Sequence, residues 1–240
     1  MNILIGGKLG DFIHSLILPQ YIFQMTGKKS NIYICNHDQE VFASGLEKSY
    51  SELLPIVSSQ MYVNHFGIYN DEIINIDLTS FRKKENLFTT SWNEFYLWNY
   101  LDSNIQIPFN HSWIDVKKDS QYDGVLLVNR NMLPYTNSVA EEFYRNYIRA
   151  YKGRAFFICS WEEQYQNFSL KDELPMLLLP ELSDVFTAIA SCEHFIGNLT
   201  ATSAMATAVN KPRTVEIFTD PIRSKYIHEM KYYNNLICFE

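Results

Sequence analysis

The chain has 240 residues, of which 47% are hydrophobic and 20% are charged, and its formal net charge is −7. This composition is typical of a globular protein and excludes a disordered or fibrous chain, and the length suits one large domain or two small ones. Because a surface that follows phosphate groups is normally rich in basic residues, the acidic balance argues against nucleic acid as a partner.

Four cysteines lie far apart and form no C-x-x-C pair, a pattern that favours reduced thiols over a disulfide framework or a zinc site. They are Cys35, Cys159, Cys192 and Cys238. The N-terminal segment is apolar, but Lys8, Asp11 and His14 interrupt it and no small-residue cleavage site follows. We therefore expect a cytoplasmic protein without a signal peptide or transmembrane segment. The oligomeric state stays open.

Strands and helices alternate through the first half of the chain, which predicts a parallel sheet covered on both faces. We expect strands at 2–5, 31–35, 61–63 and 72–76, and helices at 12–21, 39–48 and 91–101. Pro19 is expected to kink the first of these helices. The last of them is apolar on more than one side, so we expect it to pack between layers or between domains.

The alternation stops at a polar stretch, 104–123, and then resumes. We interpret this stretch as a linker and divide the chain into domains 1–115 and 116–240. In the second domain we expect strands at 124–128, 155–159, 176–179, 194–196, 214–218 and 236–239, and helices at 138–151, 183–191 and 201–209. The first of these helices would bury Val139, Phe143, Tyr147, Ile148 and Tyr151.

The first candidate motif is the glycine-rich turn after the first strand, Gly6-Gly7-Lys8-Leu9-Gly10-Asp11. Open α/β sheets bind ligands at such a turn, although the glycine spacing is not that of the dinucleotide fingerprint. Gly10 would let a ligand approach the backbone closely. Asp11 is either a helix N-cap or an ionised carboxylate that accepts a proton from a substrate hydroxyl. His14 and Lys8 are possible cleft residues, but a core position is favoured for a lone histidine.

The second motif runs from Phe195 to Ala206, where a strand leads through small hydroxyl residues into a helix. The free N–H groups at the start of that helix, together with Thr200, Thr202 and Ser203, would bind an anion or a diphosphate. A plain N-cap with polar neighbours is the alternative.

Two further candidates follow strands of the second domain. Arg130 stands where a strand ends and could fork onto phosphate, so that Arg130→Ala would weaken diphosphate affinity; a surface ion pair is the alternative. Trp161 could stack on a base, with Glu162 or Glu163 accepting hydrogen bonds from ribose, or these residues simply begin a helix. Arg82-Lys83-Lys84 is interpreted as a solvated loop without a role.

The first two motifs together resemble a known family. Leu9-Gly10-Asp11-Phe12-Ile13-His14-Ser15-Leu16 resembles the L-G-D-V-I-H-T-L element of the bacterial heptosyltransferases, glycosyltransferase family 9. The stretch from Leu182 through Phe195-Ile196-Gly197-Asn198 to Lys211-Pro212 is similar to that family's L-S-x-V…V-I-G-N-D-S-G-P-M-H-L-A-A-A-L-G-K-P. From Gly197 to Pro212 the spacing agrees without a gap, and the two matches lie at opposite ends of the chain.

The resemblance implies a GT-B fold, an α/β architecture with two Rossmann-like domains that face a central cleft. Domain 1–115 would take the acceptor, a glycan or glycoconjugate, and domain 116–240 would bind a nucleotide-sugar donor. The implied reaction is inverting and needs no metal or other cofactor. By the family pattern, Asp11 would be the general base, Asn198 and the Thr200–Ser203 loop would hold the donor diphosphate, and Glu162 or Glu163 would lie near the ribose.

The chain departs from the family within the second motif. Where the family has D-S-G-P-M-H, Leu199, Ala201 and Ala204 replace the acid, the glycine and the histidine. For this reason the sequence does not predict an ADP-linked heptose, and the donor sugar, its base and the acceptor stay open. Two other functions are considered: a catalytically silent binding or scaffold module, in which Asp11 caps its own helix, and a DNA-base glycosyltransferase, which would need a basic cleft.

Overall fold

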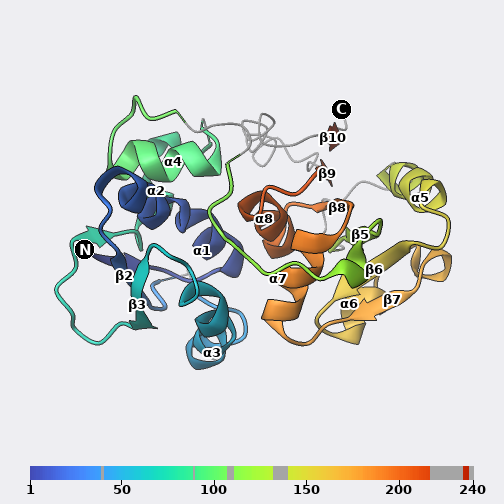
Figure 1. Ribbon diagram of the computed structural model, residues 1–240, viewed down its shortest axis with the longest axis horizontal. Coiled ribbons are helices and arrows are strands. Elements are labelled where there is room, and N and C mark those ends of the chain that lie inside the picture. Colours follow the sequence, from blue (N-terminus) through green and yellow to red (C-terminus); the bar gives the residue numbers. More distant parts are fainter. Residues whose placement is uncertain (39–40, 89, 107–110, 132–139, 217–234, 238–240) are drawn as a thin grey trace. The chain divides into compact units, whose positions relative to one another are not determined.

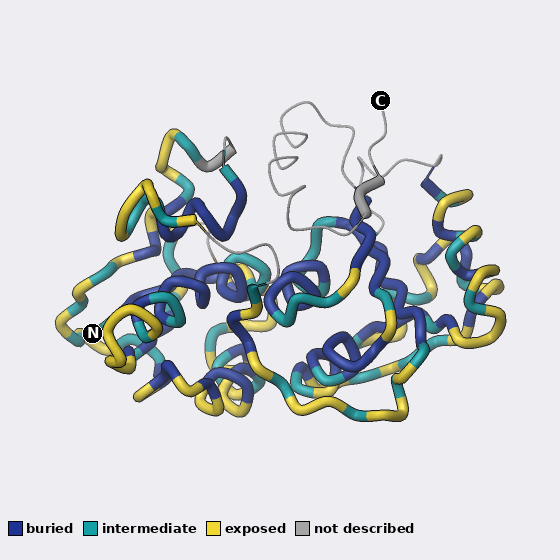
Figure 2. The backbone as a smooth tube through the Cα atoms, turned by 45° about the horizontal axis from the view of Figure 1, so that its top comes forward, coloured by how far each residue is buried: buried dark blue, intermediate teal, exposed yellow. Residues whose placement is uncertain are grey.

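The computed structural model describes residues 1–38, 41–88, 90–106, 111–131, 140–216 and 235–237. The chain divides into two compact units, Met1–Asp115 and Val116–Glu240. Each unit is built on its own parallel sheet (Figure 1). Buried residues gather along the strands and on the inner sides of the helices (Figure 2). The two parallel sheets with helices confirm the predicted α/β class.

The sheet of the first unit has four parallel strands in the order β3-β2-β1-β4. The strands are β1 (Asn2–Ile5), β2 (Ser30–Ile34), β3 (Val63–Ile68) and β4 (Ile76–Asp77). Ile3 pairs with Ile32 on one side and with Ile76 on the other, and both Ile3 and Ile32 are fully buried. Strands covered on both faces are rich in such apolar side chains, and this is why the sequence predicted β1 and β2. The strands predicted at 61–63 and 72–76 are misplaced, since each shares only one residue with β3 or β4.

The first predicted helix is in fact two helices, α1 (Leu9–Ser15) and α2 (Ile17–Thr26). The interruption that we expected from Pro19 is present, but it lies at Leu16. Pro19 is the third residue of α2, where a backbone N–H would have no partner within the helix, so the proline fits there.

The helix predicted at 39–48 is wrong except for its last turn, 46–48, which begins α3 (Leu46–Val57). Residues 41–45 are not helical, and α3 starts after Gly45, whose φ of 87° is left-handed.

The aromatic helix predicted at 91–101 is confirmed as α4 (Trp92–Tyr100), with Ser91 as its N-cap. It packs on α1 and α2 and follows two short 3-10 turns, η1 (Phe81–Lys83) and η2 (Glu85–Phe88). The start of the predicted linker also belongs to this core. Trp113 is buried, its indole Nε1 donates to the Ile13 carbonyl at 2.8 Å, and its own carbonyl accepts from the Tyr62 hydroxyl at 2.8 Å.

The sheet of the second unit has six parallel strands in the order β10-β9-β8-β5-β6-β7. The strands are β5 (Leu126–Asn129), β6 (Ala155–Cys159), β7 (Met176–Leu178), β8 (His194–Asn198), β9 (Arg213–Glu216) and β10 (Asn235–Ile237). Every strand predicted here is present, with ends that differ by a few residues. The chain reverses direction along the sheet between β5 and β8, an order typical of a doubly wound sheet.

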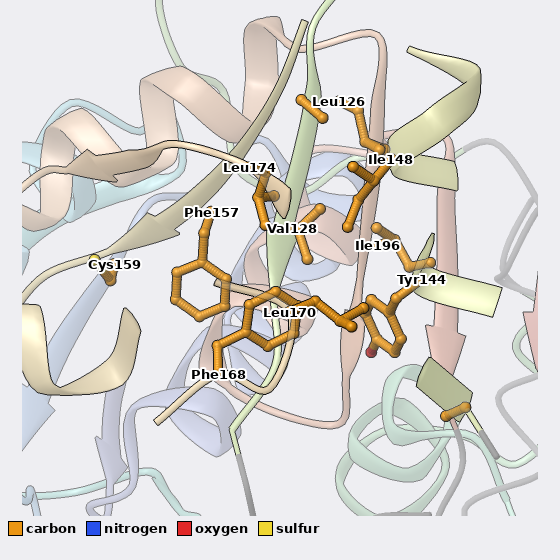
Figure 3. Close-up of a cluster of buried hydrophobic side chains, with 12 residues drawn as sticks. Leu126, Val128, Tyr144, Ile148, Phe157, Cys159, Phe168, Leu170, Leu174 and Ile196 are labelled. Atoms are coloured by element: carbon orange, nitrogen blue, oxygen red, sulfur yellow. The ribbon is translucent and has the colours of Figure 1, made fainter. Parts of the chain in front are cut away.

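Helices cover both faces of this second sheet. They are α5 (Ala140–Ala150), α6 (Glu162–Gln166), α7 (Leu182–Ser191) and α8 (Ala201–Ala208), with short 3-10 turns η3 (Ser120–Tyr122) and η4 (Lys171–Glu173). One face carries a cluster in which Tyr144 and Ile148 of α5 pack with Val128, Phe157 and Ile196 of the strands (Figure 3).

The buried face predicted for the first helix of this unit is wrong in part. Phe143 is 45% exposed, and its neighbour Tyr144 is fully buried instead. Ile148 is buried, and Tyr147 and Tyr151 pack at the edge of the cluster as expected, whereas Val139 lies outside the described residues.

The described cysteines carry no disulfide. Cys159 and Cys192 are buried, and burial raises the pKa of Cys159 to about 11 and that of Cys192 to about 12, which keeps both thiols neutral. Cys35 is half-buried, and burial and then the charge of Asp77 raise its pKa to about 11. Cys238 lies outside the described residues. Within the described part of the chain, no helix has the length and apolar character to cross a bilayer.

Candidate functional site

In the first unit, the glycine-rich turn places Asp11 in the first turn of α1 but not at its cap. Lys8 is the N-cap, and its φ of 65° is left-handed, a conformation that is uncommon for a residue other than glycine. The N-cap interpretation of Asp11 is therefore wrong. Gly10 is the second residue of α1, and the Lys8 side chain is exposed. The described turn thus presents a carboxylate at the positive end of a helix, where its ionised form is favoured.

The Asp11 carboxylate forms an ion pair with Arg82 of η1, whose Nη2 donates to Asp11 Oδ2. The side chain of Asp11 is 13% exposed and that of Arg82 is 29% exposed, so the pair lies at the surface of the unit without being freely solvated. The guanidinium also lies over the Phe81 ring, 5.0 Å from its centroid. The interpretation of Arg82 as a solvated loop residue is therefore wrong, whereas Lys83 is exposed as expected.

Aromatic packing holds the two partners in place. Phe81, which is 3% exposed, contacts the rings of Trp92, Phe95 and Tyr96 at centroid distances of 5.9, 6.2 and 5.7 Å. The Tyr96 hydroxyl donates to the backbone carbonyl of Asp11 at 3.3 Å. The segment that carries Arg82 and the helix that carries Asp11 are thus both fixed on α4.

His14 lies in the packed interior of this unit, as expected for a core histidine. It is 7% exposed, and its ring stacks on Trp92 with centroids 5.9 Å apart and an interplanar angle of 11°. Trp113 lies on another side of the ring at 6.3 Å. This packing leaves His14 little access to a ligand.

In the second unit, polar side chains meet where β5, β6 and β8 end. Asn129, the last residue of β5, donates through Nδ2 to the Ile158 carbonyl of β6 at 2.8 Å. Its Oδ1 accepts from the Thr202 hydroxyl of α8 at 2.8 Å. The carboxyl edge of a parallel sheet is where such folds bind their ligands, so this edge is the candidate site of the unit.

Gly197 and Asn198 bring the ends of β8 and β5 together. A Cβ at position 197 would collide with the carbonyl oxygen of Asn129, so this position requires glycine. The Asn198 side chain accepts from the N–H of Asn131 at 3.2 Å and donates to its carbonyl at 2.7 Å. Asn198 is fully buried, and its hydrogen bonds in this structure shape the edge of the sheet.

The predicted helix after this edge is α8, and Thr200 is its N-cap. Thr200 has an extended backbone and its side chain makes no capping hydrogen bond to the helix. Its hydroxyl lies 2.9 Å from that of Thr202. Both threonines are half-buried at the helix start, whereas Ser203 is only 2% exposed. The two threonine hydroxyls and the first N–H groups of α8 are therefore the polar groups that a ligand could reach at this end of the helix.

Arg130 forms a buried ion pair. This differs from both expectations for it, a contact with phosphate and an ion pair at the surface. Its Nε and Nη2 donate to the two carboxylate oxygens of Glu216 at 2.7 and 2.9 Å, and both side chains are 1% exposed. The Tyr144 hydroxyl donates to the same carboxylate at 3.0 Å. Burial alone would lower the pKa of Arg130, but the hydrogen bonds and charge of Glu216 outweigh it and raise the pKa. The geometry gives no support to a diphosphate contact by Arg130.

Trp161 is an exposed aromatic residue at this edge. It follows β6, is the N-cap of α6 and is 54% exposed, while Glu162 and Glu163 are exposed in the first turn of that helix. This arrangement fits the plain helix start that we considered, and it also leaves the indole ring accessible to a stacking partner.

Sequence reasoning missed Arg82, Asn129 and Glu216. Asn129 could have been found, because it ends a predicted strand at the edge where the other candidates lie. No local pattern marks the other two, since each meets its partner across 71 and 86 positions of the chain.

Comparisons with known proteins were made at the level of sequence and of structure. No protein-family model matches the chain, and no curated protein matches its sequence. Among solved structures, a glycosyltransferase family 9 protein from Veillonella parvula superposes with a TM-score of 0.62 at 12% identity, covering 100% of this chain and 85% of that one. The E. coli ADP-heptose LPS heptosyltransferase II matches with a TM-score of 0.58 at 12% identity, covering 99% and 89%. The E. coli heptosyltransferase WaaC, solved with ADP-2-deoxy-2-fluoro heptose, matches with a TM-score of 0.56 at 13% identity, covering 100% and 93%.

This chain has the fold of the heptosyltransferases. The match extends over both units, so the resemblance expected from the two motifs is confirmed for the fold. At identities of 12–13%, the likeness identifies no substrate.

Proposed function

We propose that the protein is a glycosyltransferase that moves a sugar from a nucleotide-sugar donor to a hydroxyl group of a glycan or glycoconjugate. One observation carries this proposal: over its whole length the chain has the fold of known glycosyltransferases, one of which was solved with a nucleotide-sugar analogue. The motifs that led to the expectation, around Asp11 and around Thr200–Ser203, support it because each lies where a strand leads into a helix.

The second unit is the proposed donor-binding unit. The first N–H groups of α8 would hold the diphosphate, because a helix start attracts negative charge and offers unpaired donors. The hydroxyls of Thr200 and Thr202 lie at the same helix start and would turn from their present partners toward the ligand. The exposed Trp161 would stack on the base, and Glu162 would accept hydrogen bonds from the ribose. We leave Arg130 out of this assignment, because Glu216 already engages its Nε and Nη2 donors.

The first unit is the proposed acceptor-binding unit, with Asp11 as general base. The acceptor oxygen would form a bond to the anomeric carbon from the face opposite the diphosphate, and its proton would pass to the Asp11 carboxylate. The bond between the anomeric carbon and the diphosphate oxygen would break, releasing the nucleoside diphosphate with inversion. The start of α8 would stabilise the charge that develops on the leaving group, so the proposed reaction needs no metal ion.

A catalytically silent module remains the contrasting hypothesis. We associated that hypothesis with an Asp11 that caps its own helix, and Lys8 occupies the cap instead. The Asp11 carboxylate instead forms an ion pair with Arg82, which lies in another segment of the same unit. A carboxylate held in this way is oriented as a general base would need to be and does not cap the helix. For this reason we favour the enzyme.

The experiment that tests the proposal combines binding and turnover. Thermal-shift measurements with ADP, UDP, GDP and CDP should find at least one that raises the melting temperature, since a ligand that binds only the folded state stabilises it. The corresponding nucleotide sugars should then be hydrolysed slowly without an acceptor and transferred with one. If no nucleoside diphosphate binds and no nucleotide sugar is consumed, the proposal is wrong.

Asp11→Asn tests the assigned base. Because it keeps the shape of the side chain but removes the proton acceptor, we expect transfer to fall by about 10²–10⁴-fold while nucleoside diphosphate binding is unchanged. The matched control is Asp184→Asn, which removes an exposed acid from the first turn of α7 and should leave transfer intact. Equal transfer rates for Asp11→Asn and the parent protein would exclude Asp11 from the mechanism.

A further inference from the structure

We infer that Arg82 is the positioning residue of the proposed general base: it aims the Asp11 carboxylate and keeps it ionised, so that the pair acts as one unit. This inference rests on the proposed function. It goes beyond it by assigning a role to a residue that lies outside both motifs and 71 positions from its partner.

Aromatic packing fixes the position of Arg82. Phe81 is buried against aromatic rings of α4. The guanidinium of Arg82 lies over the Phe81 ring, 5.0 Å from its centroid. The Tyr96 hydroxyl of the same helix donates to the Asp11 backbone. The Arg82 cation thus approaches the Asp11 carboxylate from a packed segment, and the segments of both residues contact α4. A base held in this way keeps the orientation that proton transfer requires.

The charge of Arg82 favours the ionised form of Asp11. An arginine is protonated at every pH at which proteins are studied, so its charge beside Asp11 is permanent. An adjacent positive charge stabilises the ionised carboxylate, and so does the start of α1. The Asp11 side chain is only 13% exposed, so water screens this interaction weakly. Without Arg82, the carboxylate would take up a proton at higher pH and would lose its function as a base there.

The two basic neighbours of Arg82 have other partners. Lys83 is 71% exposed on its side chain and lies 3.5 Å from Asp38, whose side chain is also exposed. Lys84 lies over the Tyr100 ring at 5.5 Å. These contacts direct the two lysines to other partners, so Lys83→Gln removes one charge from the same 3-10 turn without touching the Asp11 pair. It is the matched control.

The test measures the pH profile of transfer for Arg82→Gln, Arg82→Lys and Lys83→Gln in the full-length protein. For Arg82→Gln we expect the acid limb of kcat/KM to move to higher pH by about one unit, because the permanent charge is lost. For Arg82→Lys we expect the acid limb of kcat/KM to stay at the pH of the parent protein, because a lysine restores the charge. Its kcat should fall several-fold, because a lysine lacks the geometry of the guanidinium. Lys83→Gln should match the parent in both respects. A purely structural role would lower the rate equally at every pH and would overturn the inference.

A second measurement does not depend on turnover. In protein labelled with ¹³C at aspartate carboxyl groups, the signal lost in Asp11→Asn identifies Asp11, and its titration midpoint should rise in Arg82→Gln and stay in place in Lys83→Gln. An unchanged midpoint overturns the inference even if the protein transfers sugar. If the midpoint rises but the parent protein consumes no nucleotide sugar, the ion pair is real, the proposed function fails and the positioning role fails with it. Melting temperatures show whether each variant is folded.

Discussion

The two arginine–carboxylate pairs of this protein differ in what surrounds them. Arg130 and Glu216 are each 1% exposed, and Tyr144 adds a third hydrogen bond to their carboxylate. Arg82 and Asp11 are 29% and 13% exposed and lie beside a left-handed turn at the start of a helix. The same two chemical groups thus occupy a dry interior in the second unit and an accessible turn in the first.

This difference indicates which pair can take part in chemistry. In a buried pair, hydrogen bonds occupy the charged groups, and removing one partner leaves the other charge without compensation in a low-dielectric interior. In the partly exposed pair, the carboxylate keeps some contact with solvent, which is the access that the proposed acceptor hydroxyl needs. We therefore expect loss of the first pair to affect stability and loss of the second to affect activity.

The largest expected effect tests this contrast directly. Arg130→Met should destabilise the second unit by about 3–5 kcal/mol, because it leaves Glu216 buried without its cation. Arg82→Met should cost only about 1 kcal/mol, since its pair is partly exposed. Three of the four tryptophans belong to the first unit, so unfolding is better followed by hydrogen exchange of peptides from β5 and β9 than by fluorescence.

A double variant provides the control. Arg130→Met combined with Glu216→Leu removes both charges and should recover most of the lost stability. If Arg130→Met leaves hydrogen exchange in β5 and β9 unchanged and instead weakens binding of a nucleoside diphosphate, then our original expectation for Arg130 is correct and its structural role is wrong.

Much of the fold could be predicted because its signals are local. Runs such as Asn2–Ile5 and Leu126–Asn129 are apolar and bounded by turn residues, so parallel strands follow from short stretches of sequence. Local patterns are weaker guides where either of two adjacent apolar residues could occupy the buried face of a helix. Phe143 and Tyr144 are adjacent, and the helical period alone does not determine which of them is buried. In the structure Tyr144 is the buried one, and its hydroxyl donates to Glu216, a partner that the sequence does not indicate.

The candidate site was predictable in part for the same reason. Asp11 and Thr202 stand in strand–turn–helix segments that a sequence shows, and both lie in the first turn of a helix. Residues that pair across distant segments of the chain, such as Arg82 with Asp11, have no local sequence pattern that indicates the pairing. Arg82 follows a buried phenylalanine in a basic run, which looks like a solvated loop, and Arg130 at a strand end looks like a phosphate ligand until the burial of Glu216 is known. Tertiary packing instead pairs Arg82 with Asp11 and buries Arg130 against Glu216.

A smaller effect comes from a half-buried histidine, whose pKa differs between the folded and the unfolded chain. Burial lowers the pKa of His194 to about 4 from 6.5, with Arg213 and Lys211 acting in the same direction and Glu193 opposing them. Its Nε2 lies 2.9 Å from the Thr214 hydroxyl, and its ring stacks on Tyr147 at 5.5 Å. Between these two pH values the unfolded chain binds more protons than the folded one, so stability is present above pH 6.5 and is lost as the pH falls toward 4.

Allowing for solvent screening of a partly buried ring, we expect this loss to be on the order of 1–2 kcal/mol. Arg130 keeps its charge across this window, so its pair cannot supply this dependence through the guanidinium. Urea unfolding of the parent protein and of His194→Gln, measured at pH 7 and pH 5, checks the expectation. The difference between the two pH values should shrink in the variant, and an equal difference in both proteins would assign the acid sensitivity of the second unit to other groups.

The smallest effect concerns the diphosphate-binding part of the donor site, which we assign to neutral groups. Thr202→Val removes the hydroxyl that donates to Asn129 and lies beside that of Thr200, while the shape of the side chain is kept. If this hydroxyl contributes one hydrogen bond to a bound diphosphate, affinity for the nucleoside diphosphate should fall by about fivefold, or about 1 kcal/mol. Thr207→Val is the control, because it removes a buried hydroxyl from the same helix that donates to the Ser203 carbonyl at 2.9 Å, away from the helix start. Titration calorimetry should show weaker binding for Thr202→Val alone. Equal affinities in the two variants would move the diphosphate away from the start of α8, and the donor site would then have to be sought elsewhere on the second unit.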